Sequence, residues 1–224
     1  YMPTSKLRLV VNGSTAFRAP NVDDLTKVFE SVPGNVIVPN PNLTPEYAYN
    51  GELGLQYEIV KNTAIGATVY QTWLTNALTV QKGTFNGSDS VLYDGQMSSV
   101  LTTTNAGRAK VYGIEAFVNA QITANLQLFA SYNYTHGRIA TDTVPYPLDH
   151  IAPAFGKVSL KYAMLQNKLK MEAFVMYSGA KELEDYNLVG EDNFAYATPN
   201  GMPSWYTLNW RANYNINNML SVQV

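Results

Sequence analysis

Hydrophobic and polar residues alternate along most of the chain with the period of a β-strand. From Tyr206 to Ile216 an aromatic or aliphatic side chain occupies every second position, and an amide, hydroxyl or guanidinium group lies between. Successive side chains of a strand point to opposite faces, so this segment predicts one apolar and one polar face. The helical spacing i, i+3, i+4, i+7 is sustained nowhere. We therefore expect an all-β protein.

The same alternation returns in at least eight further segments, several of which match the ~9–11 residues that a tilted strand needs to cross a bilayer. In the segment 112–122 Phe117 is the exception, an aromatic residue in the polar parity. The apolar parities comprise Leu7, Leu9 and Val11; Leu53, Leu55, Tyr57 and Ile59; Ile65, Ala67, Val69 and Trp73; Tyr112, Ile114, Ala116, Val118, Ala120 and Ile122; Leu126, Leu128, Ala130, Tyr132 and Tyr134; Val158, Leu160 and Tyr162; Leu169, Met171, Ala173, Val175 and Tyr177; and Leu220, Val222 and Val224.

The connections between these segments alternate between short and long. Short turns are expected at 61–63, 123–125, around 165–167 and at 217–219, and long polar loops at 19–47, 77–107, 137–151 and 179–204. This organisation predicts an antiparallel up-and-down transmembrane β-barrel with short periplasmic turns and long extracellular loops. Three-residue turns would keep the apolar parity on one face. Asn residues in the turns favour the left-handed conformation: Asn62, Asn125, Asn217 and Asn218.

Composition decides which face meets water. Charged residues make up only 14% of the chain and Tyr numbers 16, so the surface does not depend on ionic solvation. The polar parity is mostly amides and hydroxyls with scattered cations, which suits a hydrated lumen, and the apolar parity would then meet lipid. Aromatic residues near strand ends fit an interfacial girdle: Tyr57, Trp73, Tyr134, Tyr162, Tyr177 and Tyr206.

Several classes of protein are disfavoured. The net charge of −2 gives no reason to expect nucleic acid as a partner, and the absence of Cys excludes disulfides and thiolate metal sites. No run approaches the ~20 apolar residues of a membrane-spanning helix. No motif indicates a catalytic centre, a resident cofactor or a metal site, and we expect no enzyme.

Five stretches resemble, in order and spacing, the C-terminal barrel of TonB-dependent outer-membrane receptors. They are STAFRAPNVDDL (14–25), NPNLTPEYAYNGELGLQY (40–57), NAGRAKVYGIEAFVNAQI (105–122), PLDHIAPAFGKVSLKY (147–162) and WYTLNWRANYNINNMLSVQV (205–224). The resemblance covers essentially the whole chain, and the FRAP, NPNL and YGIE segments in this order are highly specific.

The resemblance implies a barrel of about 22 strands around an N-terminal plug domain, with a TonB-binding segment ahead of it. Residues 1–224 would then be part of a single barrel domain, with about eight complete strands and the start of a ninth, and without the plug, the TonB-binding segment or the last strand of the barrel. The implied function is uptake of a scarce nutrient, such as a ferric siderophore or another metal chelate, across the bacterial outer membrane. The implied partners are outer-membrane lipid, the nutrient and TonB.

Structural roles are the simpler expectation for the polar residues of the motifs. Residues 40–43 most simply encode turns, Glu46 would orient the base of a loop, and Arg18 would pair with a carboxylate of unknown position. Only His136 and His150 provide imidazole, and either would face a loop-lined cavity or make ordinary loop hydrogen bonds. Haem receptors of this family usually carry a His between the FRAP and NPNL boxes, and residues 20–39 contain none, which disfavours haem.

Substrate contacts remain unassigned by the sequence. The acidic residues of the fourth long loop, Asp185, Glu191 and Asp192, lack the spacing of a calcium loop. Candidate ligand contacts are the loop aromatic residues, since loops on a rigid barrel vary freely: Phe85, Tyr93, Phe194 and Tyr196.

Two other architectures fit the alternation. A complete eight-stranded outer-membrane barrel would serve adhesion or structure. A soluble β-sandwich would bind carbohydrate through exposed Trp and Tyr, with its apolar face packed against a second layer.

Overall fold

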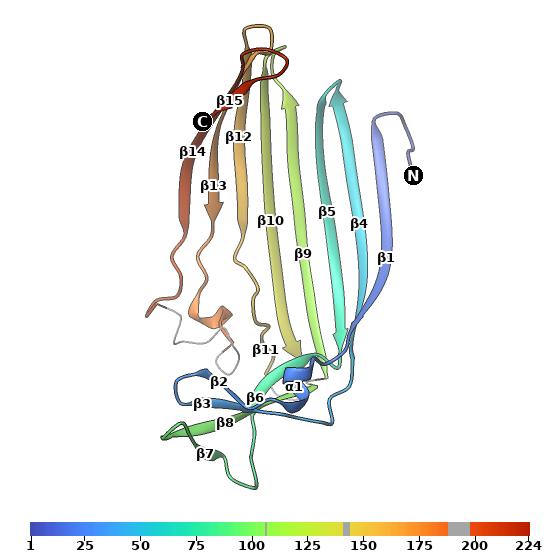
Figure 1. Ribbon diagram of the computed structural model, residues 1–224. Helices are drawn as coiled ribbons and strands as arrows, with labels where there is room; N and C mark the ends of the chain where they lie inside the picture. The colour runs from blue at the N-terminus through green and yellow to red at the C-terminus, as the bar shows by residue number, and fades with distance from the viewer. Residues whose placement is uncertain (106, 141–143, 188–197) are drawn as a thin grey trace.

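A large antiparallel sheet dominates the computed structural model, which describes residues 1–105, 107–140, 144–187 and 198–224 (Figure 1). Its strands follow one another in the order β1, β4, β5, β9, β10, β12, β13, β14 and β15, and β11 pairs with β10. We call this sheet the wall. Its strands are β1 (Leu7–Arg18), β4 (Glu46–Val60), β5 (Thr63–Thr75), β9 (Arg108–Gln121), β10 (Leu126–Ala140), β11 (Tyr146–Pro147), β12 (Phe155–Met164), β13 (Leu169–Ser178), β14 (Trp205–Asn215) and β15 (Ser221–Gln223).

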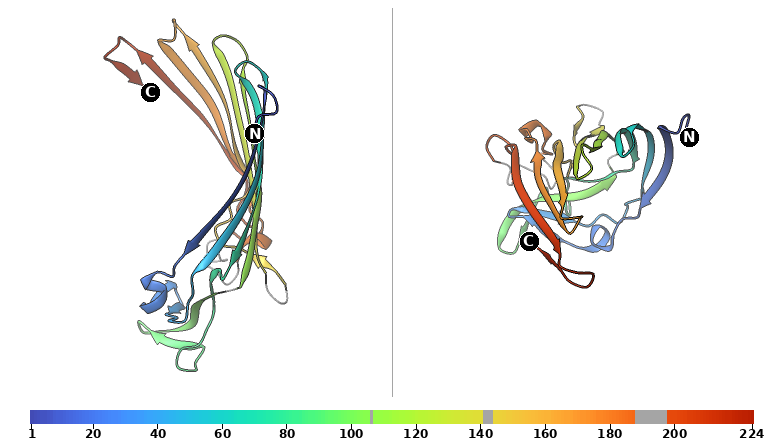
Figure 2. Two further views of the ribbon diagram at one scale, coloured as in Figure 1. Left: turned by 90° about the vertical axis from the view of Figure 1, so that its right-hand side faces the viewer. Right: turned by 90° about the horizontal axis from the view of Figure 1, so that it is seen from above.

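The wall is curved and open. Seen from above it forms an arc whose two ends, β1 and β15, do not pair with each other (Figure 2). Eight long strands and a short ninth give the expected partial barrel and contradict a closed eight-stranded one. Leu208 is 76% and Trp210 58% exposed, so no second layer of described residues covers the apolar parity, and the β-sandwich interpretation is wrong.

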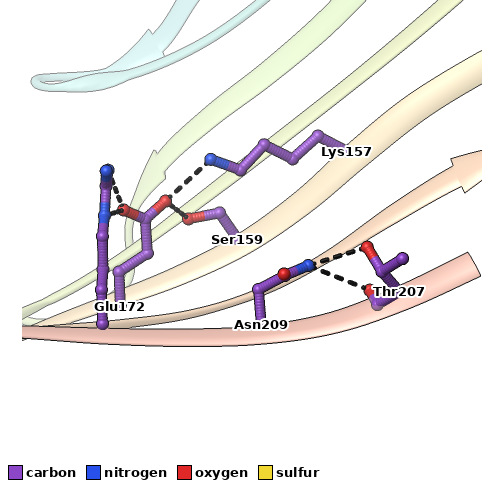
Figure 3. Close-up of polar contacts among 6 residues, drawn as sticks. Lys157, Ser159, Glu172, Thr207 and Asn209 are labelled. Atoms are coloured by element: carbon purple, nitrogen blue, oxygen red, sulfur yellow. Dashed lines mark hydrogen bonds and ion pairs between the residues drawn. The ribbon is translucent and has the colours of Figure 1, made fainter. Parts of the chain in front are cut away.

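The register of the wall separates the two faces as the alternation predicts. On one face it places apolar side chains side by side across six strands: Ile65, Val118, Ala130, Val158, Val175 and Leu208. On the other it places a polar row across five: Gln121, Gln127, Lys161, Glu172 and Arg211. We call these the outward and inward faces, since Lys157, Ser159 and Glu172 project into the space enclosed by the arc (Figure 3).

Phe117 is accommodated on the inward face by a glycine on the neighbouring strand. Gly66 is its cross-strand partner, and a Cβ at that position would lie 2.5 Å from the Phe117 ring. The ring therefore needs a residue without a side chain beside it. Gly113 serves Tyr70 in the same way, because a Cβ there would lie 2.4 Å from the phenol oxygen, which is 2.7 Å from Thr135 Oγ1.

The turns opposite the long loops are short, but their chemistry differs from the expectation. Three residues connect Ile122 to Leu126 and Ile216 to Leu220, as expected. The turn after β4 has two residues with a register shift between Glu58 and Val60, and the turn after β12 has four. In the first case the register shift, and in the second the four-residue length, keeps the apolar side chains of the two connected strands on the same face.

Left-handed Asn was expected in four of these turn positions and occurs in one, Asn62. At 217–219 the side chain of Asn217 instead accepts hydrogen bonds from the backbone N–H groups of Met219 and Leu220, at 2.8 and 2.9 Å. Thr123 does the same for the N–H groups of Asn125 and Leu126. A side-chain oxygen at the start of the turn therefore replaces the left-handed residue.

The first two long loops contain a second sheet that the alternation did not reveal. Its order is β2, β3, β8 and β6, with β7 beside β8, and β3 runs parallel to β8. It lies at the loop end of the wall, on the inward side (Figures 1 and 2), and we call it the loop sheet. Its strands are β2 (Phe29–Val32), β3 (Asn35–Val38), β6 (Leu78–Lys82), β7 (Ser90–Tyr93) and β8 (Gln96–Asn105).

Two small apolar clusters hold the loop end together. Val36, Val38 and Val100 form the core of the loop sheet, with Val36 fully buried. Ala77 and Ile139 lie in a second cluster that joins the loop after β5 to β9 and β10. The helices are short, α1 (Val22–Thr26) and the 3-10 helix η1 (Leu183–Asp185), and neither is long and apolar enough to span a membrane.

Candidate functional site: the inward face and the loop mouth

A buried carboxylate organises the inward face of β12, β13 and β14. Glu172 is 4% exposed and accepts hydrogen bonds from Ser159 Oγ at 2.6 Å, Lys157 Nζ at 3.0 Å and Arg211 Nε at 2.6 Å (Figure 3). The Arg211 Nη2 group also contacts the same carboxylate. One buried anion is thus matched by two cations from the flanking strands, as a buried charge requires.

The two cations of this cluster also lie over an aromatic ring. Lys157 Nζ is 4.2 Å and the Arg211 guanidinium 5.9 Å from the centroid of Phe174. Lys161, the direct cross-strand neighbour of Glu172, and Lys170 form no ion pair within the described ranges, and with Arg211 they line a groove of about 580 Å³ near the short turns. The inward face of β12 to β14 is therefore polar and cationic.

At the loop end an ion pair joins the FRAP segment to the start of β4. Arg18 Nε lies 2.8 Å from Glu46 Oε1, and the two residues are cross-strand partners. The other carboxylate oxygen of Glu46 accepts the backbone N–H of Leu78 at 2.9 Å. This provides Arg18 with the carboxylate that the sequence left unspecified and confirms that Glu46 orients the base of a loop.

The asparagines of the NPNL and NAGR segments connect loops to one another. Asn40 donates to the Thr103 carbonyl at 3.0 Å and accepts the backbone N–H of Asn42. Asn105 accepts the N–H of Thr44 and donates to the carbonyls of Thr44 and Asn76. These contacts support the structural interpretation of residues 40–43.

The two histidines lie in different places. His150, with a left-handed φ of 62°, lines a cavity of about 380 Å³ at the loop mouth together with Arg18, Asp24, Thr79 and Asp149. His136 instead belongs to the outward parity of β10, where its ring lies 5.1 Å from that of Tyr112. Of the two alternatives, a place at a loop-lined cavity thus holds for His150, whereas the parity of β10 turns His136 away from the lumen.

The loop aromatic candidates do not converge on one site. Phe85 is 41% exposed, whereas Tyr93 packs against the core of the loop sheet. Phe194 and Tyr196 lie outside the described residues, as do Glu191 and Asp192. Asp185 accepts a hydrogen bond from Arg138 Nη2 at 2.9 Å, and the described residues contain no group of His, Cys, Asp and Glu able to hold a metal ion.

Both Glu172 and the loop sheet were missed in the sequence analysis, although each is indicated by a pattern in the sequence. Glu172 is the only acidic residue on the inward parity of β12, β13 and β14, among several cations. The dipeptides Asn86-Gly87 and Asp94-Gly95 are left-handed at both positions, as two-residue hairpin turns require. An Asn-Gly or Asp-Gly pair inside a long polar stretch is a sufficient signal for a hairpin.

Comparison with known proteins gives a relationship over the whole chain. The family model described as "TonB dependent receptor-like, beta-barrel" matches residues 1–224. A probable haemoglobin and haemoglobin-haptoglobin-binding protein of Haemophilus influenzae is 30% identical over 200 residues, which are 83% of this chain and 19% of that protein. An iron-regulated outer membrane virulence protein of Vibrio cholerae is 32% identical over 127 residues, 55% of this chain and 19% of that protein.

Solved structures show the same fold at low sequence identity. The ferric enterobactin receptor of Pseudomonas aeruginosa superposes with a TM-score of 0.74 at 16% identity, covering 100% of this chain and 32% of that one. A copper transporter superposes with a TM-score of 0.71 at 16% identity, covering 98% and 30%. The chain spans about a fifth of the curated relatives and a third of these structures. The match over residues 1–224 shows that the chain belongs to the family of TonB-dependent receptor-like β-barrels of the outer membrane.

Proposed function

We propose that the chain forms part of the barrel domain of a receptor that takes up a scarce nutrient, a ferric siderophore or another metal chelate, with energy supplied through TonB. The observation that carries this proposal is the family match over residues 1–224. The wall agrees with it, because its outward face is apolar and its inward face is polar. The names of the relatives support iron as the nutrient, since one is iron-regulated and one structural neighbour is a ferric enterobactin receptor.

Within this function the wall would separate lipid from an aqueous passage, and the loops would meet the ligand first. The cavity lined by Arg18, Asp149 and His150 opens at the loop mouth, where a ligand arriving from outside enters. Rigid support suits this position, because the ion pair of Arg18 with Glu46 and the contacts of Asn105 fix the surrounding segments.

Deletion of the gene that encodes this chain tests the proposal. Growth on ferric siderophores as sole iron source and uptake of radioactive iron should fall at least tenfold and return on complementation. Uptake by the complemented strain should cease without TonB. Unchanged growth on every iron chelate, together with loss of copper accumulation, would move the proposal to the other metal represented among the structural neighbours.

Haem is a second candidate ligand, favoured by the haemoglobin-binding relative that matches 83% of the chain and by the place of His150 at the cavity. The absence of His from residues 20–39 argues against it. The two histidines provide a matched pair for the test in the full-length protein. A haem receptor predicts that His150→Ala weakens the haem Soret absorbance change while His136→Ala does not, and equal behaviour of both variants argues for a siderophore.

A further inference from the structure

The ionic side chains of the outward face are confined to one corner. Across the eight long strands of the wall, the outward parity carries ionic groups at three positions, Arg108, Lys110 and Arg138. All three are cations, and all lie at the loop ends of the adjacent strands β9 and β10.

The positions of these cations bring like charges close together, which is electrostatically unfavourable. Lys110 and Arg138 are direct cross-strand partners, and Arg108 lies one outward position further along β9. Like charges directly opposite each other on a sheet destabilise it, since their Cβ atoms are ~5 Å apart. Arg138 is compensated by Asp185 at 2.9 Å, but Arg108 and Lys110 are exposed and form no ion pair or side-chain hydrogen bond with the described residues. Among the residues that the structure describes, Arg108 and Lys110 therefore have no counter-charge.

Aromatic and apolar surface continues from this corner along the same strands. Trp73 is the cross-strand neighbour of Lys110, and Tyr112 follows on β9. Six residues below Lys110, about 20 Å along the strand, begins an apolar groove of about 450 Å³. Small residues form its floor, Ala116, Ala130 and Gly156, and Tyr132 and Tyr177 border it.

We propose that this corner and groove bind a membrane lipid with a phosphate headgroup in the loop-side leaflet. Arg108 and Lys110 would bind the phosphate, as cations bind anionic oxygens through charge-assisted hydrogen bonds. Trp73 and Tyr112 would lie at the headgroup level, and an acyl chain would lie in the groove between Tyr132 and Tyr177. A lipid is favoured over a soluble anion because the cations share a face with the side chains that meet hydrocarbon.

Native mass spectrometry of the full-length protein in detergent tests the site. The probe is phosphatidic acid, compared with phosphatidylcholine and with inorganic phosphate. We expect phosphatidic acid to bind on the order of tenfold more weakly to the double variant Arg108→Gln/Lys110→Gln. The control Lys161→Gln/Lys170→Gln removes the same charge from the inward face and should bind like the wild type.

Other outcomes overturn the proposal. Equal weakening in both double variants would mean a non-specific charge effect, and competition by inorganic phosphate at the same concentration would mean a free-anion site. If the glutamine variant does not fold, Arg108→Lys/Lys110→Arg retains the charge, and its binding should fall as salt rises. Salt-independent binding would refute the role of the cations. Iron uptake is measured separately, so failure of this site leaves the proposed transport function standing.

Discussion

The wall and the loop sheet bury their apolar residues in opposite ways. The wall leaves its apolar parity open, so that Leu208 is 76% exposed, and it has no core of its own along most of its length. The loop sheet encloses Val36, Val38 and Val100, all 5% exposed or less. The wall therefore depends on a surrounding apolar solvent, whereas the loop sheet is built like a small water-soluble domain. Both arrangements occur close together in the sequence, since β1 (Leu7–Arg18) belongs to the wall and β3 (Asn35–Val38) to the loop sheet.

The largest effect should come from placing a charge on the outward face of the wall. Val158→Arg puts a guanidinium in the middle of the apolar row of β12 and should lower the free energy of unfolding by about 3 kcal/mol. Urea titration of the full-length protein folded in lipid vesicles measures this. The control Asn209→Arg, on the inward face of β14, should cost less than about 1 kcal/mol. Equal costs would mean that the outward face does not meet lipid.

Removing the buried carboxylate of the inward face should have the next largest effect. Glu172→Gln leaves Lys157 and Arg211 without their anion, and we expect a loss of about 2 kcal/mol, reduced by water at the half-exposed Arg211. The same titration measures it, with Glu115→Gln, an exposed residue of the same face, as a nearly neutral control. The double variant Glu172→Gln/Arg211→Gln should lose less than the sum of the single ones.

A cavity in the loop sheet should have a smaller and local effect. Val100→Ala removes two buried methyl groups and should destabilise the loop sheet by about 1.5 kcal/mol. Hydrogen exchange at the amides of β3 and β8 should accelerate while exchange in β12 and β13 is unchanged. Leu92→Ala, at a side chain 66% exposed, serves as control. Acceleration in the wall as well would show that the two sheets unfold together.

The smallest effect concerns the hairpin turn of the loop sheet. Gly95 has a φ of +83°, and Gly95→Ala should cost about 1 kcal/mol, confined to β7 and the start of β8. Limited proteolysis of that hairpin reports it. Gly13→Ala is the matched control, since a Cβ at Gly13 meets nothing within 4 Å and its φ is ordinary. Identical cleavage rates for both variants would contradict the strained turn.

The wall could be predicted from the sequence because its period-two pattern is long and repeated. The alternation and the register follow from one rule, that a strand shows alternate residues to each face. Two of the aromatic residues on the inward face, Phe117 and Tyr70, depend on glycines of a neighbouring strand, which a single segment does not reveal. The turn conformations could not be predicted either, because they depend on which side chain accepts hydrogen bonds from the backbone N–H groups, as Thr123 and Asn217 show.

The loop sheet and the candidate site were less predictable for a different reason. The parallel pairing of β3 with β8 joins residues about 64 positions apart, such as Val36 and Val100, and no local pattern specifies a partner at that separation. The partner of Arg18 likewise came from a different strand. His136 lies within β10, whose parity turns it outward, whereas His150 lies in a turn before β12 with a left-handed φ that the sequence does not announce.

The side-by-side pairing of β3 and β8 makes the first two extracellular connections a single mechanical unit. One connection is anchored on β1 and β4 and the other on β5 and β9, so neither can swing aside without dragging the other or breaking the backbone ladder between them. A force applied to one rim segment is thereby shared among four membrane-crossing strands. As long as this ladder holds, any widening of the entrance on this side is one concerted movement of both connections.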